Sequence, residues 1–150
     1  MSGLIFGVFQ LNQFRTQQRN DVASNLTQTF YSKDLAKALV RMQELPDGIT
    51  LKDMRARGAE YVAAAILVTT SFETMGLQVF KRIAPMELVQ DLAGGIIGVM
   101  YRKLGQWQED VRIEQNQPSW GEWFEWLGDK INQRKETTQP AHIKYRNWSP

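Results

Sequence analysis

The segment "SWGEWFEWL", residues 119–127, combines three tryptophans and a phenylalanine with two glutamates. Carboxylates beside aromatic rings are typical of sugar sites, of proton-transfer sites and of recognition surfaces. On a helix, however, the large apolar residues fall on one face and the acids on the other. Ser119 and Glu122 also have the S-x-x-E spacing of a capping box. We therefore favour a helix that closes the core over a sugar or carboxylate-pair site, with Trp126, at the edge of the stripe, as a candidate partner contact.

Glu73 is the second candidate for chemistry, because apolar residues flank it on a predicted core helix. A carboxylate in such a place needs a partner or has a raised pKa. Three arginines are candidates for a buried ion pair with it: Arg41, Arg102 and Arg112. We expect a structural pair rather than a catalytic acid, because no second polar group converges on Glu73 in the sequence.

Four glycines crowd the segment "DLAGGIIGVMYRKLG", residues 91–105. The segment lacks both the Gly-Lys-Ser/Thr ending of a P-loop and the strand that precedes one. Glycine inside a helix costs up to about 1 kcal/mol relative to alanine, so a glycine-lined face indicates close approach by another backbone. The preceding helix, which carries Gly76, is the expected neighbour. A ligand groove between these two helices is the alternative.

The composition argues against several classes of site. Cysteine is absent, and the only histidine, His142, lies in a polar tail, so disulfides, thiolate sites and multi-histidine metal sites are excluded. Glu87 and Asp91 are four residues apart, but no Glu-x-x-His pair of the diiron type accompanies them. Lysines and arginines alternate with acids, and the net charge is only +2. We expect no metal, no cofactor and no nucleic-acid partner.

The periodicity predicts an all-α fold, a single helical bundle of five or six helices with a long N-terminal helix. Residues 1–30 form an apolar, juxtamembrane helix, residues 31–136 form the bundle, and residues 137–150 form a surface tail. Apolar stripes at three- and four-residue steps predict long helices over 60–82 and 86–114. We expect these two to form a central antiparallel pair, clasped by the aromatic C-terminal helix.

Local capping signals divide the chain between these long helices. Ser32 is a good N-cap for a short amphipathic helix, and "LPDG", residues 45–48, ends that helix in a turn. Thr50 and Asp53 have a capping-box-like arrangement that begins another short helix. Pro85 suits the first turn of the helix that follows it.

The segment "LIFGVFQLNQF", residues 4–14, is the most apolar part of the N-terminal region. Eleven helical residues span about 16 Å, against about 30 Å for a bilayer core, so this segment cannot cross a membrane alone. It is a truncated membrane anchor, an interfacial helix, or a helix docked on its own domain. Its sleeve of apolar side chains is wider than one core-facing stripe needs, and we expect it to contact a second copy or another subunit: Leu4, Ile5, Phe6, Val8, Phe9 and Leu11.

Several motifs resemble an uncharacterised bacterial domain-of-unknown-function family over nearly the whole chain. They are "FGVFQLNQFRTQQR" (6–19), "FETMGLQVFKRIAPMELVQDLAGG" (72–95), "YRKLGQWQEDVR" (101–112), "EWFEWL" (122–127) and "YRNWSP" (145–150). The resemblance implies one N-terminal membrane helix followed by a helical cytoplasmic domain. This chain departs from that pattern, since its membrane helix is shortened to the last few turns. The residues after Arg15 would then lie on the cytoplasmic face, in agreement with the flanking positive charges.

Together these features predict a non-enzymatic interaction or scaffold module at the cytoplasmic face of a bacterial membrane. Self-association or incorporation into a larger assembly is the expected role, with possible membrane contact through the N-terminal helix. The alternative is a small-ligand sensor or an enzyme whose pocket lies between the helices at 60–82 and 86–114. An enzyme needs several polar groups aimed at one cavity, whereas an interaction module needs an exposed apolar patch.

Overall fold

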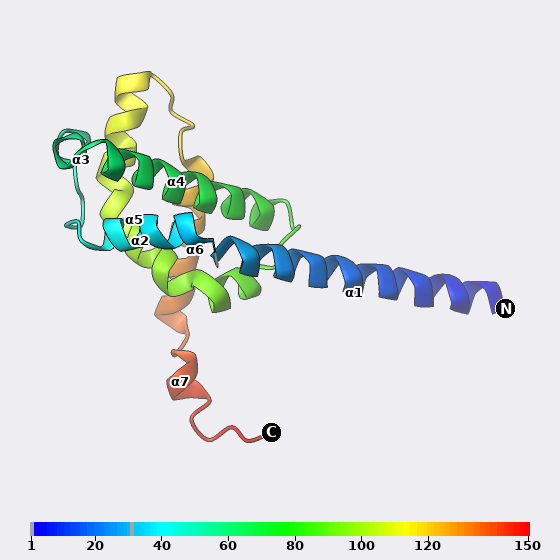
Figure 1. Ribbon diagram of the computed structural model, residues 1–150. Coiled ribbons are helices and arrows are strands. Elements are labelled where there is room, and N and C mark those ends of the chain that lie inside the picture. Colours follow the sequence, from blue (N-terminus) through cyan, green and yellow to red (C-terminus); the bar gives the residue numbers. More distant parts are fainter. Residues whose placement is uncertain (1, 31) are drawn as a thin grey trace.

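The computed structural model describes the backbone of residues 2–30 and 32–150, and the side chains from Ile5 onward except that of Tyr31. Within these ranges the chain is helical and has no strand, which confirms the all-α fold (Figure 1). Six helices have seven or more residues, and a seventh is a single turn in the tail. They are α1 (Ser2–Phe30), α2 (Lys33–Gln43), α3 (Leu51–Arg57), α4 (Ala59–Phe80), α5 (Met86–Gln115), α6 (Glu122–Thr137) and α7 (Ala141–Lys144).

The local start signals of α2 and α3 are confirmed. Ser32 caps α2 and accepts a hydrogen bond from the Leu35 amide at 3.4 Å. Thr50 caps α3, accepts from the Asp53 amide at 3.1 Å and donates to the Asp53 carboxylate at 2.9 Å. In both cases one side-chain oxygen satisfies an amide that the first turn leaves without a helical partner.

The capping box predicted for α6 is wrong. This helix begins at Glu122 rather than at Ser119, and Gly121 precedes it with φ of 68° and no side-chain cap. A left-handed conformation at this position favours glycine, which has no Cβ to clash with the following carbonyl. The first amides of α6 must therefore find an acceptor from another element.

Two layers of helices cross in the bundle. α1 and α2 run in one direction and α4 returns beside α2, whereas α5 and α6 form an antiparallel pair that crosses them (Figure 1). The bundle therefore has a central antiparallel pair, but its members are α5 and α6 and not the predicted helices at 60–82 and 86–114. The connection after α4 explains the difference: Arg82 is left-handed, with φ of 58°, and redirects the chain before α5 begins.

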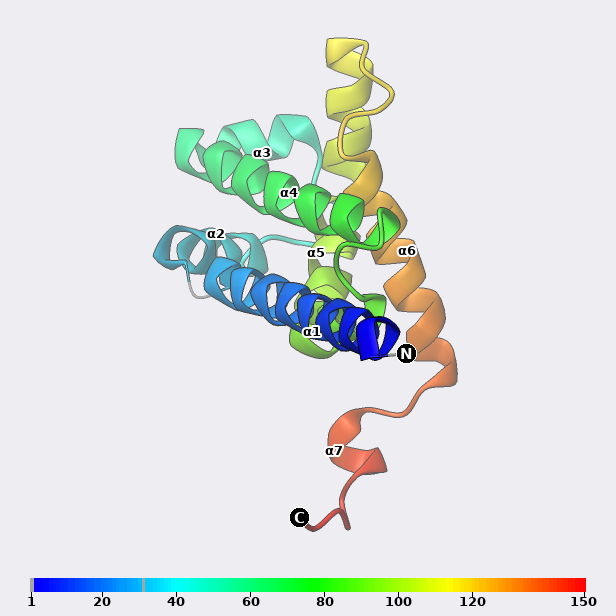
Figure 2. The same ribbon diagram turned by 90° about the vertical axis from the view of Figure 1, so that its right-hand side faces the viewer.

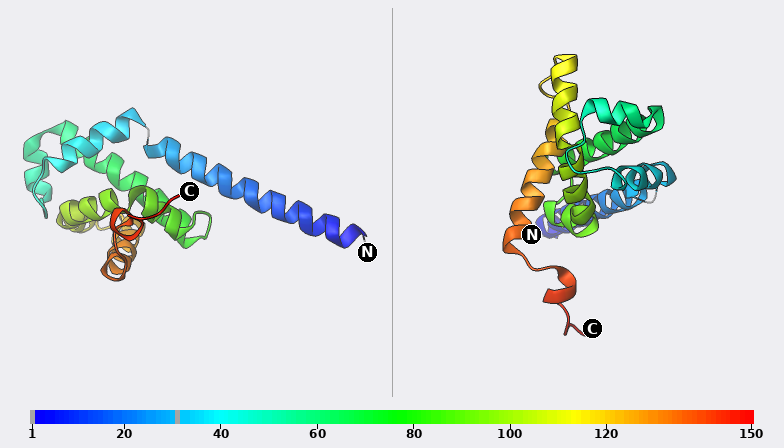
Figure 3. Two further views of the ribbon diagram at one scale, coloured as in Figure 1. Left: turned by 90° about the horizontal axis from the view of Figure 1, so that it is seen from below. Right: turned by 90° about the vertical axis from the view of Figure 1, so that its left-hand side faces the viewer.

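The core lies where α4 crosses α5 and α6. Phe72 of α4 is fully buried and packs against Phe124 of α6, with ring centroids 5.3 Å apart. Trp107 of α5 is 1% exposed and meets Trp120 edge to face at 5.1 Å. Because aromatic side chains bury more area than other residues, these contacts hold α6 on the bundle. The residues from Gln133 to the C-terminus are exposed, and the tail after α6 extends away from the bundle (Figure 3).

Candidate interaction site

Helix α1 is attached to the bundle only through its C-terminal third. Leu26 is buried, Val22 and Phe30 are half-buried, and the Phe30 ring lies 6.5 Å from that of Phe72. All residues from Val8 to Asp21 are exposed, and the helix projects past the edge of the domain (Figure 3). The first half of α1 therefore stands free of its own bundle.

Large apolar side chains cover this free half, here named the arm and defined as residues 5–14. Each is between 56% and 73% exposed: Ile5, Phe6, Val8, Phe9, Leu11 and Phe14. Five of the six are sequence-predicted contact residues, and Phe14 extends the set. The side chain of Leu4, the sixth predicted residue, lies outside the described part of the chain. The structure therefore contradicts one of the three options for this segment, a helix docked on its own domain.

Only α4 among the described helices is long and apolar enough to cross a bilayer. Its residues Val68, Phe72 and Met75 are at most 2% exposed, and they pack against the other helices of the bundle. A helix in the core of a soluble domain can have the same length and apolar composition as a membrane-spanning helix. Because these residues are buried in the bundle, we assign α4 to the core.

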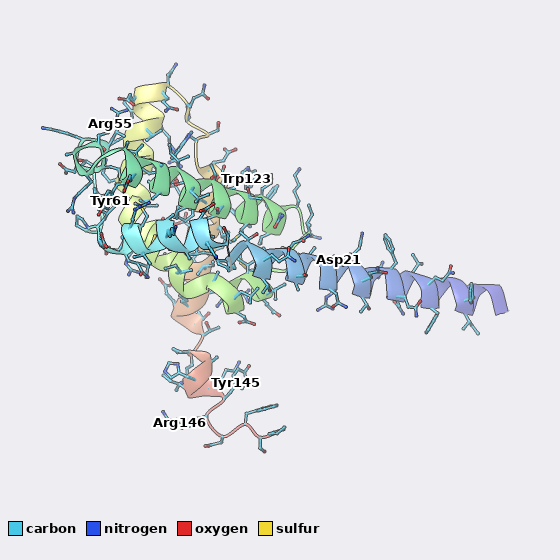
Figure 4. The ribbon with its side chains drawn as sticks, in the orientation of Figure 1. Asp21, Arg55, Tyr61, Trp123, Tyr145 and Arg146 are labelled. Carbon is cyan, nitrogen blue, oxygen red and sulfur yellow. The ribbon has the colours of Figure 1, made fainter. Side chains whose placement is uncertain are left out.

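Glu73 is half-buried at the place where α4 meets the start of α6. Its carboxylate accepts a hydrogen bond from the Phe124 amide at 2.8 Å, and the Trp123 amide is a second donor to it. Figure 4 shows Trp123 at this junction. The carboxylate thus caps α6 from another helix and meets the positive end of the helix dipole.

The predicted ion pair between Glu73 and an arginine is wrong. Arg41 pairs with Glu60 at 3.1 Å and Arg102 with Asp47 at 3.4 Å. Arg112 contacts Glu109 and Glu125, at 3.2 and 2.5 Å, and donates to the Trp120 carbonyl at 2.7 Å. Backbone amides take the place of a cation, since two of them at a helix N-terminus satisfy a carboxylate without a charged partner.

Burial raises the pKa of Glu73 above its ordinary value, and this effect exceeds the opposing effect of the two amides. Glu122 also raises the pKa, whereas Arg112 lowers it. A carboxyl with a raised pKa in the folded state binds a proton on folding. Its contribution to stability is complete below the ordinary pKa of a glutamate and is lost as the pH rises through the folded-state value.

We expect Glu73→Ala to lower the free energy of unfolding by about 1–2 kcal/mol, the usual cost of removing a helix cap. Glu73→Gln keeps an acceptor for one amide and removes the titration. Urea unfolding from pH 4 to pH 7 should show that wild type loses stability relative to Glu73→Gln as the pH rises. A constant difference between the two proteins over this range would contradict the assignment, and so would an alanine variant with unchanged stability.

The glycine face of α5 packs against α6 rather than against α4. A Cβ on Gly98 would lie 3.0 Å from Lys135 Nζ and 3.3 Å from the Asn132 carboxamide, and the Lys135 ammonium donates to the Gly94 carbonyl at 2.6 Å. Gly76 of α4 also meets α6, at the Trp123 backbone. The expected approach of α4 to this face is therefore wrong, because α6 fills it.

Two cavities of the described residues lie beside α1, and neither lies between α4 and α5. One of about 330 Å³ separates α1 from α4 and is lined by uncharged groups that include Thr29, Thr70 and Thr74. Another, of about 350 Å³, separates α1 from α5 and includes Arg19 and Pro85. In the described part of the chain, no group of three or more acidic or histidine side chains is arranged to hold a metal ion.

A buried polar cluster under the start of α6 escaped sequence reasoning. Thr69 and Gln108 are each 2% exposed, and the Gln108 carboxamide oxygen fills the space beside Gly121. Neither residue stands out in the sequence, because both lie within apolar stripes and neither is charged. The Thr69 hydroxyl and the Gln108 carboxamide oxygen have no hydrogen-bond partner among the described residues, and the cluster contains no acid or base of its own.

A second exposed apolar surface surrounds the end of α4. The Phe80 ring lies 4.5 Å from that of Trp123 and 5.7 Å from that of Trp126, and Ile83 follows in the next loop. Phe80 and Ile83 are about half exposed, and both tryptophans are half-buried. These four residues are named the aromatic corner. The predicted partner contact, Trp126, belongs to it.

A family model described as "Domain of unknown function (DUF4760)" matches residues 1–131. The chain belongs to the DUF4760 family. This confirms the predicted resemblance to an uncharacterised domain family, and the DUF4760 match takes in the arm, Glu73 and the aromatic corner. No curated protein and no solved structure matches the chain. A bacterial origin and an N-terminal membrane helix remain predictions.

Proposed function

We propose that this chain is a non-enzymatic interaction module that works at the cytoplasmic face of a membrane and self-associates, or joins a larger assembly, through the arm. The exposure of the arm carries the proposal. Six large apolar side chains surround a helix that projects from the domain, with none of them buried against it. Contiguous apolar surface of this kind marks an interaction site in proteins.

The distribution of these side chains favours a protein neighbour. Ile5, Phe6 and Leu11 point in different directions around the helix axis, so one partner face covers only some of the apolar side chains. A bundle of several arms, in which each arm has a neighbour on either side, buries more of this surface than one partner face does, and full burial of a large side chain contributes about 1.5–3 kcal/mol.

We expect the full chain to sediment as an oligomer in dilute buffer, and Phe6→Gln/Phe9→Gln to reduce its mass towards the 17.3 kDa of one chain. Helical content and melting should stay unchanged, because both side chains are free of the bundle. Sedimentation velocity and circular dichroism measure these quantities.

A matched control is available in Val40→Gln/Ile113→Gln, which replaces two exposed apolar residues of the bundle itself. This variant should keep the wild-type mass. A wild-type chain that is monomeric without detergent and does not pellet with vesicles would refute the proposal.

A further inference from the structure

Two basic residues lie within the aromatic corner. The connection from α4 to α5 reads Phe80, Lys81, Arg82, Ile83, and both cations are exposed. Phe80 is 49% and Ile83 57% exposed, and the Lys81 ammonium lies 6.0 Å from the centre of the Phe80 ring. Aromatic and aliphatic groups beside cations are the combination that enters the interfacial layer of a membrane, where rings and charges both find partners.

The corner lies on the side of the domain from which α1 projects. Figure 2, which looks along α1 from its N-terminus, shows the connection from α4 to α5 beside α1 and on the same side of the bundle. Arg19 of α1 and Pro85 of the connection line one cavity, which fixes their level along the helix. Phe14, the last residue of the arm, is five residues from Arg19, or about 7–8 Å along the axis.

Charge complementarity selects an anionic surface as the occupant. The connection itself contains no acid, and Arg15 and Arg19 of α1 add two exposed cations at its level. Glu87 and Asp91 are the acids on the neighbouring first turns of α5. The Glu87 carboxylate faces Arg134 at 3.9 Å, which reduces its effect on an approaching anion.

We propose that the aromatic corner with Lys81 and Arg82 docks on the anionic headgroups of a lipid bilayer. Lys81 and Arg82 bind phosphate oxygens, while Phe80, Ile83 and Trp126 enter the headgroup layer beside them. This contact goes beyond the proposed assembly through the arm and orients the domain on the membrane. Arms that associate in parallel would bring the corner of every copy to the same side, so the two contacts are compatible.

The test compares Lys81→Gln/Arg82→Gln with Lys52→Gln/Arg57→Gln in the full chain. Both pairs are exposed, and each removes two positive charges, from +2 to 0, so net charge is matched. Lys52 and Arg57 lie on α3, at the end of the domain opposite to α1 (Figure 1). Binding is measured by co-sedimentation with vesicles of phosphatidylcholine alone and with one-third phosphatidylglycerol.

Wild type should bind the mixed vesicles more tightly than the neutral ones, and added salt should weaken the difference. The corner variant should bind the mixed vesicles about thirtyfold more weakly than wild type, since each cation near an anionic surface contributes about fivefold. The control pair should keep most of the wild-type affinity. Equal losses in the two variants would overturn the proposal, because net charge alone would then account for the binding.

A second measurement reads the contact directly. Lipids brominated near the headgroup should quench the tryptophan fluorescence of wild type and of Trp148→Phe, and Trp126→Phe should lose a large part of this quenching. Absence of quenching in all three proteins would overturn lipid docking. A change of mass in Lys81→Gln/Arg82→Gln without vesicles would also overturn it, because the corner would then contact a protein. Assembly through the arm is measured by the mass in the absence of lipid. A failure of that proposal is therefore distinguishable from a failure of lipid docking through the corner.

Discussion

Replacing Phe124 by alanine should lower the free energy of unfolding by about 3–5 kcal/mol, the usual cost of a large-to-small change of a core aromatic residue. Phe124 is fully buried, and its ring packs on Phe72 at 5.3 Å. The substitution removes the contact that holds α6 on α4 and leaves a cavity between two helices that cross. Chemical denaturation followed by circular dichroism measures the loss.

Trp123→Ala is the matched comparison, one residue earlier on the same helix. Its side chain is larger but half-buried, and it packs against the exposed Phe80 ring. We expect it to cost less than Phe124→Ala. If the tryptophan variant were the less stable of the two, the aromatic corner would belong to the core rather than to the surface.

The helix wheel placed the aromatic segment on the core but could not rank its members. Of the large apolar residues between 120 and 131, Phe124, Leu127 and Ile131 are buried, whereas Trp120 and Trp123 are only half-buried. Periodicity defines a face to within about one residue, and the exact line of contact depends on how α4 crosses α6. That crossing is set by residues distant in sequence, which a local pattern does not contain.

A helix cap can be predicted from the sequence when the capping residue is close to the amide that it caps. Ser32 and Thr50 each bond an amide three residues ahead, and three residues of sequence are enough to predict such a bond. The cap of α6 comes instead from Glu73, which accepts a hydrogen bond from the Phe124 amide, 51 residues later in the sequence. The sequence indicates a buried carboxylate at Glu73 but favours a cation as its partner, because backbone donors have no sequence signature.

The arm shows the same division between local and distant information. Its apolar sleeve is visible in the sequence, and the structure leaves every described member of the predicted set exposed. Composition alone does not show where α1 leaves the bundle, since that depends on how Val22, Leu26 and Phe30 pack against the core. The exposure of the arm follows from those contacts together with the length of α1.

Gly76→Ala should lower the free energy of unfolding by about 3 kcal/mol, at the upper end of the usual cost of overpacking. A Cβ at this position would meet the Trp123 carbonyl oxygen and lie 2.7 Å from the carbonyl carbon. Both are backbone atoms of α6, so no side-chain rotation relieves the clash. The two helices must separate, which also weakens the hydrogen bond from the Phe124 amide to Glu73.

The same substitution at Gly95 should have the opposite sign. Gly95 is an exposed residue in the interior of α5, and a Cβ there meets no atom within 4 Å. Gly95→Ala should therefore stabilise the protein by about 0.5–1 kcal/mol, because alanine has the higher helix propensity. The opposite signs separate helix propensity, which both substitutions improve, from the contact of α4 with α6, which only Gly76→Ala disturbs. If both variants gained stability, the close approach of α4 to α6 at Trp123 would be wrong, and with it the position of the cap that Glu73 provides.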